Sequence, residues 1–360
     1  MKVKKIITVV GARPQFVKAA VLSRLFKNIP DIEEKIIHTG QHFDAGMSDI
    51  FFQEMDIPQP HFRLDINGVG HGAMTGRMLE KIEEVLIQEK PDLVLVYGDT
   101  NSTLAGALAA SKLHIKVAHV EAGLRSFNNK MPEEINRILT DRISSVLYAP
   151  TQTAVNNLQK EAFDQLDCEI VLSGDVMQDA ALFYAQKCDE NCSDIVKDLP
   201  SKFILCTIHR AENTDDLSNL TQIVEAVNHI HNTIPVVLPL HPRTQKLIQQ
   251  AGLQLNALVL PPVGYFDMLY LLKNCSLVMT DSGGLQKEAF FFGKNCVTMR
   301  EQTEWVELVE NGFNVLSGAN KNNIIQLCLD MLQKQNNFNI NLYGNGEAGQ
   351  NITNHILKNI

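Results

Sequence analysis

Acidic side chains end two apolar, strand-like runs in the first half of the chain, and they have the chemistry needed to transfer protons. Asp99 follows the run 94–98, and Glu121 follows the run 117–120. Such runs indicate buried strands of a parallel sheet, where ligands bind beyond the carboxyl ends. Neighbouring carboxyls in a cleft suit general acid–base catalysis, because burial and mutual repulsion raise their pKa values toward neutrality. We therefore expect Asp99 and Glu121 to be catalytic.

Two further acidic residues, Glu133 and Glu134, follow Pro132 at an expected helix start. The helix dipole alone favours acidic side chains in a first helical turn, so a structural role is the main alternative for this pair. Glu133 is a third candidate for proton transfer.

The second half of the chain contains a candidate phosphate-binding turn. Asp-Ser-Gly-Gly at 281–284 follows the apolar run 277–280 and opens a helix. Backbone N–H groups and the positive end of the helix dipole attract phosphate there, and a carboxylate one turn later suits ribose hydroxyls. An ordinary N-cap is the alternative, although it would not require two glycines. The pattern favours a nucleoside diphosphate, bound by Ser282, Gly283, Gly284 and Glu288.

A glycine and a proline open the first expected helix, in Gly-Ala-Arg-Pro at 11–14. This helix start places Arg13 and Lys18 where they could face an anion. Two of the three glycines of the dinucleotide fingerprint are missing, so we expect no nicotinamide cofactor.

Two histidines with nearby arginines also follow strand-like runs. His209 and Arg210 come after the run 203–207, and His241 comes shortly before Arg243. A histidine at a strand end is often only a structural hydrogen-bonding residue. Two of them, each with an arginine close by, favour an anionic ligand.

Short β-branched runs alternate with amphipathic segments along the chain, which is typical of a parallel sheet with helices on both faces. The pattern restarts near residue 203 and gives more strands than one doubly wound sheet usually has. We therefore predict an α/β fold of two Rossmann-like doubly wound domains with a cleft between them. We expect a hinge at the polar cluster 189–194. The expected parts are residues 1–174 with the carboxylates, residues 175–338 with the nucleotide site, and a C-terminal segment at 339–360.

Composition and charge exclude several classes of protein. Of the 360 residues, 45% are hydrophobic and 20% are charged, which excludes a disordered chain, collagen and a coiled coil. A net charge of −9 without a basic block argues against a nucleic-acid partner. No apolar stretch approaches the ~18 residues that cross a bilayer, so we expect no membrane partner. Seven scattered cysteines predict a reducing, cytoplasmic location and no metal site.

Together, these motifs resemble the non-hydrolysing UDP-N-acetylglucosamine 2-epimerase family over nearly the whole chain. The resemblance implies the glycosyltransferase-B arrangement of two Rossmann-like domains, a C-terminal helix that returns to the first domain, and a homodimer. The motifs that carry it are Gly-Ala-Arg-Pro at 11–14, Tyr-Gly-Asp-Thr at 97–100, His-Val-Glu-Ala-Gly-Leu-Arg at 119–125, Pro-Glu-Glu-Ile-Asn-Arg at 132–137, His-Arg-Ala-Glu-Asn at 209–213 and Thr-Asp-Ser-Gly-Gly at 280–284.

The resemblance also implies roles for single residues and a reaction. The family expels UDP as the proton leaves carbon 2 of the sugar, forms a 2-acetamidoglucal, and adds UDP back after protonation from the other face. This needs a base, an acid and donors for the departing diphosphate. By motif, the catalytic residues are Asp99, Glu121, Glu133 and His209, and the nucleotide-sugar contacts are Arg13, Lys18, Ser282, Gly283, Gly284 and Glu288.

Three motifs look like the branch of the family that acts on UDP-2,3-diacetamido-2,3-dideoxy-glucuronate, a precursor of bacterial surface polysaccharide. They are the sequences at 11–16, 40–44 and 303–305. Trp305 and Val306 replace an Arg-Pro pair common in the family, and a flat apolar ring suits an additional acetamido methyl group. In the alternative, Trp305 fills the core of the second domain. Candidate partners for the uronate carboxylate are Arg125 and Arg300.

Four alternative functions remain open from the sequence. The substrate could be plain UDP-N-acetylglucosamine, or the enzyme could be a hydrolysing epimerase that releases the free sugar. A glycosyltransferase of the same fold would bind the same donor without needing three carboxylates. A nucleotide-sugar binding module would use Ser282 but not Asp99 or Glu133.

Overall fold

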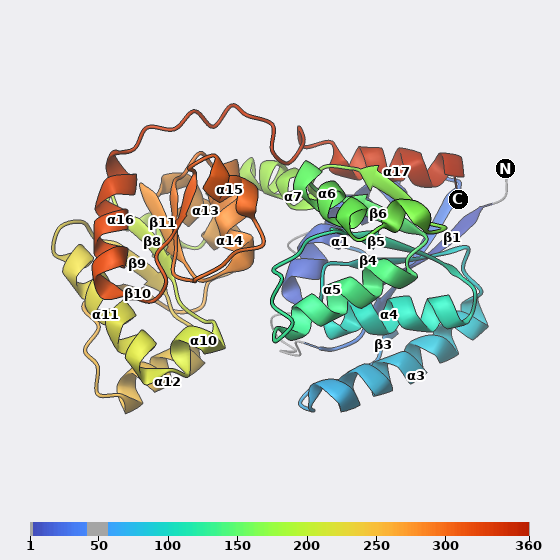
Figure 1. Ribbon diagram of the computed structural model, residues 1–360, viewed down its shortest axis with the longest axis horizontal. Helices are drawn as coiled ribbons and strands as arrows, with labels where there is room; N and C mark the ends of the chain where they lie inside the picture. The colour runs from blue at the N-terminus through green and yellow to red at the C-terminus, as the bar shows by residue number, and fades with distance from the viewer. Residues whose placement is uncertain (1–2, 42–56, 360) are drawn as a thin grey trace. The chain divides into compact units, whose positions relative to one another are not determined.

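The computed structural model describes residues 3–41 and 57–359, which form two compact units (Figure 1). Unit 1 comprises residues 1–180 and 341–360, and unit 2 comprises residues 181–340. Each unit has one parallel sheet covered by helices, so the predicted α/β fold with two Rossmann-like domains is confirmed.

The sheet of unit 1 has seven strands in the order β3-β2-β1-β4-β5-β6-β7, and all neighbouring strands are parallel. The chain starts at a central strand and moves outward in both directions, which is the doubly wound pattern. The apolar runs predicted β1, β4, β5 and β6 but not β2, in which three of seven residues are charged. The strands are β1 (Lys4–Val10), β2 (Ile32–His38), β3 (Phe62–Arg63), β4 (Leu93–Tyr97), β5 (Lys116–Val120), β6 (Val146–Ala149) and β7 (Glu169–Leu172).

The helices of unit 1 lie on both faces of this sheet, because right-handed crossovers that move in opposite directions from the centre place their helices on opposite sides. The last helix returns to this unit and packs against the first (Figure 1). Gly349 permits this contact, since a Cβ there would lie 2.6 Å from a methyl carbon of Val21. The helices are α1 (Arg13–Phe26), α3 (His71–Glu89), α4 (Asn101–Lys112), α5 (Pro132–Ile143), α6 (Gln152–Lys160), α7 (Val176–Ala185), which continues into unit 2, α17 (Ala348–Asn359) and the 3₁₀ turn η1 (Phe163–Gln165).

Unit 2 has a six-stranded parallel sheet in the order β10-β9-β8-β11-β12-β13. Alternate residues of its central strand are buried on opposite faces: Ile204 and Cys206 pack on one side, and Leu205 packs on the other. This double burial explains why its strands read as continuous apolar runs. The strands are β8 (Ile204–Thr207), β9 (Val236–Pro239), β10 (Leu258–Leu260), β11 (Leu277–Thr280), β12 (Cys296–Thr298) and β13 (Asn314–Leu316).

Several helices of unit 2 begin after a polar side chain that caps them. Asp216, Ser282 and Asn320 each accept a hydrogen bond from a backbone N–H in the first turn of the helix that follows. Within residues 3–41 and 57–359, no helix combines the length and apolarity needed to cross a membrane. The helices are α8 (Cys188–Asn191), α9 (Asp194–Lys197), α10 (Ala211–Thr214), α11 (Leu217–His231), α12 (Pro242–Gln250), α13 (Tyr265–Asn274), α14 (Gly283–Phe291), α15 (Val306–Glu310) and α16 (Lys321–Gln333).

Candidate active site

Two of the predicted catalytic carboxylates lie at the carboxyl ends of adjacent strands in unit 1. Asp99 follows β4 and Glu121 follows β5, and these strands pair in register up to Tyr97 and Val120. Glu121 has a positive φ of 72°, a conformation that costs a non-glycine residue about 1 kcal/mol. Strain of this kind concentrates at functional sites, where it fixes the direction of a side chain.

Each of these carboxylates is paired with a cation. The Lys18 ammonium contacts Glu121, and only 10% and 8% of the two side chains are exposed. The Arg137 guanidinium contacts Asp99, whose side chain is 32% exposed. Gly98, which precedes Asp99, lies against the Lys18–Glu121 pair, since a Cβ there would be 3.1 Å from Lys18 Nζ and 3.3 Å from Glu121 Oε2. The structure thus brings Lys18, Asp99 and Glu121 together and adds Arg137, whose contact with Asp99 was not predicted from the sequence.

The two acidic residues in the first turn of α5, Glu133 and Glu134, have different environments. Glu134 is buried, and its carboxylate accepts hydrogen bonds from the backbone N–H groups of Ser126 and Phe127. Burial alone would raise the pKa of Glu134, but the hydrogen bonds from Ser126 and the charge of Arg137 outweigh it, so the pKa is lowered. Glu134 is therefore structural. Glu133 is only half-buried.

The turn before α1 is held by the side chain of Gln15. Its side-chain oxygen accepts from the N–H groups of Gly11 and Ala12 at 2.8 and 3.0 Å, and its nitrogen donates to the Tyr97 carbonyl oxygen at 2.9 Å. Gln15 thereby ties this turn to the end of β4. Arg13 is the first residue of α1, and its side chain lies outside the described part of the chain, as do residues 42–44 of the motif at 40–44.

In unit 2, the fully buried carboxylate of Asp281 organises the candidate nucleotide site. It accepts hydrogen bonds from the backbone N–H groups of His209 and Arg210 and from the Asn213 amide, and it lies 3.0 Å from His209 Nδ1. Burial would raise the pKa of Asp281, but the hydrogen bonds and charge of the histidine ring and these backbone donors lower it overall. Because Asp281 holds Nδ1, the half-exposed ring of His209 presents Nε2 away from it. The sequence motif contained Asp281, but its pattern gave no sign of this role.

The helix α14 has the open N-terminus that the Asp-Ser-Gly-Gly motif predicts. Ser282 is its N-cap, and Ser282 Oγ accepts from the Leu285 N–H at 3.5 Å. A Cβ at Gly283 would collide with the Glu304 carboxylate, whereas nothing lies within 4 Å of a Cβ at Gly284. The two glycines therefore differ in what they provide. Gly283 allows close contact with Glu304, and Gly284 leaves open space over the helix end. Glu288 is buried on the same helix.

The remaining predicted contacts differ in their surroundings. Arg210 is half-buried, and its Nη2 lies 3.6 Å from the Cβ position of Gly283, so it belongs with the α14 turn. His241 is exposed, and its Nδ1 accepts a hydrogen bond from the Arg243 N–H as the N-cap of α12. That contact is the structural role which a histidine at a strand end often has.

The structure changes the interpretation of Trp305 and of the two arginines proposed for a uronate. Trp305 is only 3% exposed, and the Lys287 ammonium lies 3.9 Å from its ring centroid, so most of the ring is packed inside the protein. Arg125 is buried in ion pairs with Asp141 and Glu161. Arg300 is also buried and pairs with Glu304. Burial and pairing make both arginines poor partners for a substrate carboxylate.

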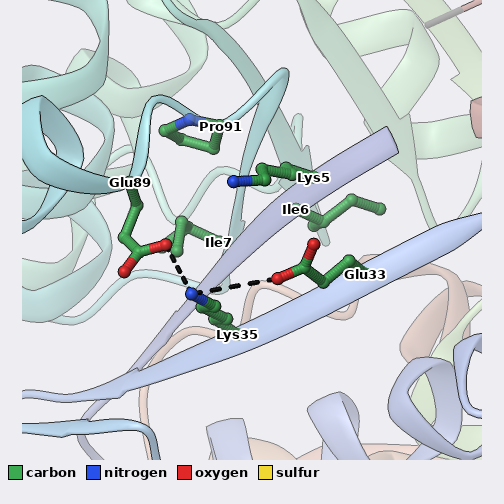
Figure 2. A pocket seen from close by; sticks show the side chains of 7 residues that line it. All are labelled: Lys5, Ile6, Ile7, Glu33, Lys35, Glu89 and Pro91. Carbon is green, nitrogen blue, oxygen red and sulfur yellow. Dashed lines mark hydrogen bonds and ion pairs between the residues drawn. The ribbon is translucent and has the colours of Figure 1, made fainter. Parts of the chain in front are cut away.

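A small pocket lies at the opposite end of the unit 1 sheet from Asp99 and Glu121 (Figure 2). It includes Lys35, whose ammonium lies 2.6 Å from Glu89 and 3.8 Å from Glu33. Its volume of about 10 Å³ leaves room for about one water molecule. It is therefore a structural ion-pair cluster and not a nucleotide site. Among the described residues, no group of three or more His, Cys, Asp or Glu side chains is placed to hold a metal ion.

Comparisons with known proteins agree on one family. The family model for UDP-N-acetylglucosamine 2-epimerase matches residues 24–357. The UDP-2,3-diacetamido-2,3-dideoxy-D-glucuronate 2-epimerase of Pseudomonas aeruginosa is 57% identical over 355 residues, covering 98% of this chain and 99% of that protein. A UDP-N-acetylglucosamine 2-epimerase of Methanococcus maripaludis is 44% identical, covering 98% of both chains. The crystal structure of the UDP-GlcNAc 2-epimerase of Methanocaldococcus jannaschii with UDP-GlcNAc and UDP matches with a TM-score of 0.90 at 42% identity, covering 99% of both chains.

Proposed function

Because the chain belongs to the UDP-N-acetylglucosamine 2-epimerase family, we propose that it inverts carbon 2 of a UDP-2-acetamido sugar without hydrolysing it. The substrate that we propose is UDP-2,3-diacetamido-2,3-dideoxy-glucuronate, which is converted to its manno epimer for surface polysaccharide biosynthesis. The observation that carries the choice of sugar is the 57% identity to an epimerase of that name across almost the whole of both chains. Relatives named for UDP-N-acetylglucosamine share less: a protein named as a homolog of that epimerase is 48% identical, and two named as the epimerase itself are 44% and 42% identical.

The carboxylates of unit 1 suit the proton transfers of this reaction. The hydrogen at carbon 2 is not acidic, because no carbonyl group adjoins that carbon in the ring. Its removal becomes feasible when the bond from carbon 1 to the UDP oxygen breaks in the same step, so that the electron pair of the C–H bond forms the double bond of a 2-acetamidoglucal. Return of the proton to the opposite face and re-addition of UDP complete the epimerisation. We assign these proton transfers to Asp99, Glu121 and Glu133.

The residues of unit 2 suit the departing diphosphate. The open N-terminus of α14 at Ser282, Gly283 and Gly284 offers backbone N–H groups and the positive end of a helix dipole. The His209 ring, oriented by Asp281, supplies a further donor to the phosphate oxygens as negative charge accumulates on UDP. Glu288, on the same helix, would accept hydrogen bonds from the ribose. No redox cofactor or metal is required for these steps.

Side-by-side kinetics test the choice of substrate. The purified protein is given UDP-2,3-diacetamido-2,3-dideoxy-glucuronate or UDP-N-acetylglucosamine, and the two epimers and free sugar are followed by NMR. The proposal predicts a higher kcat/KM for the diacetamido uronate and a product that is still attached to UDP. A higher kcat/KM for UDP-N-acetylglucosamine would refute the diacetamido uronate as the substrate, while the proposed carbon-2 epimerisation would still stand. Release of free sugar would instead indicate a hydrolysing epimerase.

We also propose that the protein works as a homodimer, which the family resemblance implies. Exposed apolar side chains in unit 1 support a surface that contacts a second copy of the chain: Phe127 is 74% exposed, and both Ile135 and Leu139 of α5 are 46% exposed. Light scattering coupled to size-exclusion chromatography should give twice the chain mass of 40.2 kDa. A mass of one chain at micromolar concentration would reject the dimer.

A further inference from the structure

A buried histidine in β5, His119, has a hydrogen-bond acceptor at each ring nitrogen. Nδ1 lies 2.7 Å from the carboxylate oxygen Oδ1 of Asp141, and Nε2 lies 2.7 Å from the carbonyl oxygen of Gly98. The ring is completely buried. Either neutral form of the imidazole would leave one nitrogen lone pair facing an oxygen lone pair at this distance, whereas the doubly protonated ring donates to both oxygens.

The surroundings of His119 balance a positive charge. The second oxygen of Asp141 lies 2.7 Å from the Arg125 guanidinium, which also pairs with Glu161 at 2.7 Å. Protonated His119 and Arg125 therefore face the carboxylates of Asp141 and Glu161, and the four groups are neutral together. Burial would raise the pKa of Asp141, but His119 and Arg125 lower it overall, so this carboxyl is ionised. Breaking such a buried network by removing one partner leaves an uncompensated charge.

The hydrogen bond from His119 acts on the peptide that precedes Asp99. Gly98 has a positive φ of 63°, and its N–H donates to the Val120 carbonyl oxygen at 3.0 Å. Its own carbonyl oxygen accepts from His119 Nε2. The turn between β4 and Asp99 is thus fixed by one hydrogen bond on each side of Gly98, and the second of these depends on a side chain. A displacement of about 1 Å at a catalytic group can cost a factor of about 100 in rate.

We propose that His119 is a positioning residue: its doubly protonated ring holds the Gly98 carbonyl and thereby orients the Asp99 carboxylate for proton transfer. This role rests on the proposed epimerase function. His119 itself does not touch the substrate, because it is completely buried behind Gly98.

Two substitutions separate the two hydrogen bonds of the ring. In His119→Asn, the amide nitrogen replaces Nδ1 and can still donate to Asp141, but nothing reaches Gly98. In His119→Gln, the longer side chain places its amide nitrogen near the Nε2 position, where it can donate to Gly98, while the bond to Asp141 is lost. Glu161→Gln is the matched control, since it perturbs the same network at its end away from Asp99.

The measurements are kcat and KM for the UDP-sugar, together with the denaturation midpoint of each variant. We expect His119→Asn to lose kcat by about 10- to 100-fold with KM changed less than about threefold, and His119→Gln to keep kcat within about threefold of wild type. Glu161→Gln should keep kcat even if its midpoint falls. The ranking of the three variants by kcat should therefore not follow their ranking by denaturation midpoint. Equal losses in both histidine variants that follow their midpoints, or no loss in His119→Asn, would overturn the proposal.

A second readout does not depend on catalysis. In ¹⁵N-histidine-labelled wild-type protein at pH 8, the His119 signals, identified by their absence in the His119→Asn spectrum, should show a proton on both ring nitrogens. An unprotonated ring nitrogen would overturn the proposal whatever the kinetics show. A wild-type protein that epimerises no UDP-sugar, yet shows a doubly protonated His119, would refute the proposed function and with it the positioning role, while the charge assignment would stand.

Discussion

The ion pair between Lys18 and Glu121 allows the proposed chemistry to be tested separately from folding. In Glu121→Gln the carboxylate is replaced by an amide of the same shape, which cannot accept a proton. A group that transfers a proton typically contributes a factor of 10²–10⁴ to the rate. We therefore expect kcat to fall ~100-fold or more, which corresponds to at least about 2.7 kcal/mol in the activation barrier.

The same substitution should have a smaller effect on folding. Both side chains are about nine-tenths buried, and leaving a buried charge without any partner costs about 3–5 kcal/mol. The amide oxygen of glutamine can still accept a hydrogen bond from the Lys18 ammonium, so we expect a loss of about 1–3 kcal/mol in the free energy of unfolding. The positive φ at position 121 is as unfavourable for glutamine as for glutamate and adds nothing to this difference.

Glu89→Gln provides the matched control, because Glu89 also pairs with a lysine (Figure 2). That lysine is Lys35 of β2, and the pair lies at the opposite end of the strands from Glu121. We expect kcat within about twofold of wild type and a smaller loss of stability than in Glu121→Gln, because the Lys35–Glu89 pair is more exposed to solvent than the Lys18–Glu121 pair. Turnover is measured by NMR at saturating UDP-sugar, UDP affinity by calorimetry, and stability by urea unfolding. If Glu121→Gln turned over within tenfold of Glu89→Gln while remaining folded, the catalytic role of Glu121 would be refuted.

Further predictions concern one residue each. Asp99→Asn should lower kcat ~100-fold while the Kd for UDP stays within about twofold of wild type, because proton transfer and diphosphate binding use different residues. Glu288→Gln should have the opposite effect: the Kd for UDP measured by calorimetry should rise about tenfold, with a smaller loss of kcat. An unchanged Kd for UDP would refute the contact between Glu288 and the ribose. Burial raises the pKa of Glu34 to about 6 although Thr8 donates to it at 2.6 Å, so ionisation destabilises the fold as pH rises from 4.5 through 6. Glu34→Gln should therefore gain up to about 2 kcal/mol over wild type between pH 4.5 and 7 in urea unfolding, and a pH-independent difference would contradict this.

The sequence predicted features that follow from local patterns. Apolar runs predicted the central strands, and the rule that ligands bind beyond strand ends selected Asp99 and Glu121, which the structure places after the ends of two adjacent strands. The glycines and serine at 282–284 predicted the open helix start of α14, which the structure shows. Each of these features depends on a few consecutive residues and the geometry of one element.

Pairings between distant residues could not be predicted in this way. Arg137 meets Asp99 across 38 positions, and His209 meets Asp281 across 72. Strand order and helix placement determine which charged groups come into contact. The hydrophobic periodicity of a sequence does not predict either of them. The environment of Trp305 was also not predictable from the sequence. Its flat apolar ring suggested contact with a ligand, but in the structure the residue is only 3% exposed and packs beside Lys287.

The fate of the hydrogen at carbon 2 tests the proposed epimerisation most directly. The wild-type protein is incubated with UDP-2,3-diacetamido-2,3-dideoxy-glucuronate in deuterated water, without added nicotinamide or metal, and the product is followed by ¹H NMR. Elimination and re-addition of UDP predict a manno epimer that carries deuterium at carbon 2 and remains linked to UDP. An epimer that retains its original hydrogen at carbon 2, or no reaction at all, would contradict the proposed elimination and re-addition of UDP.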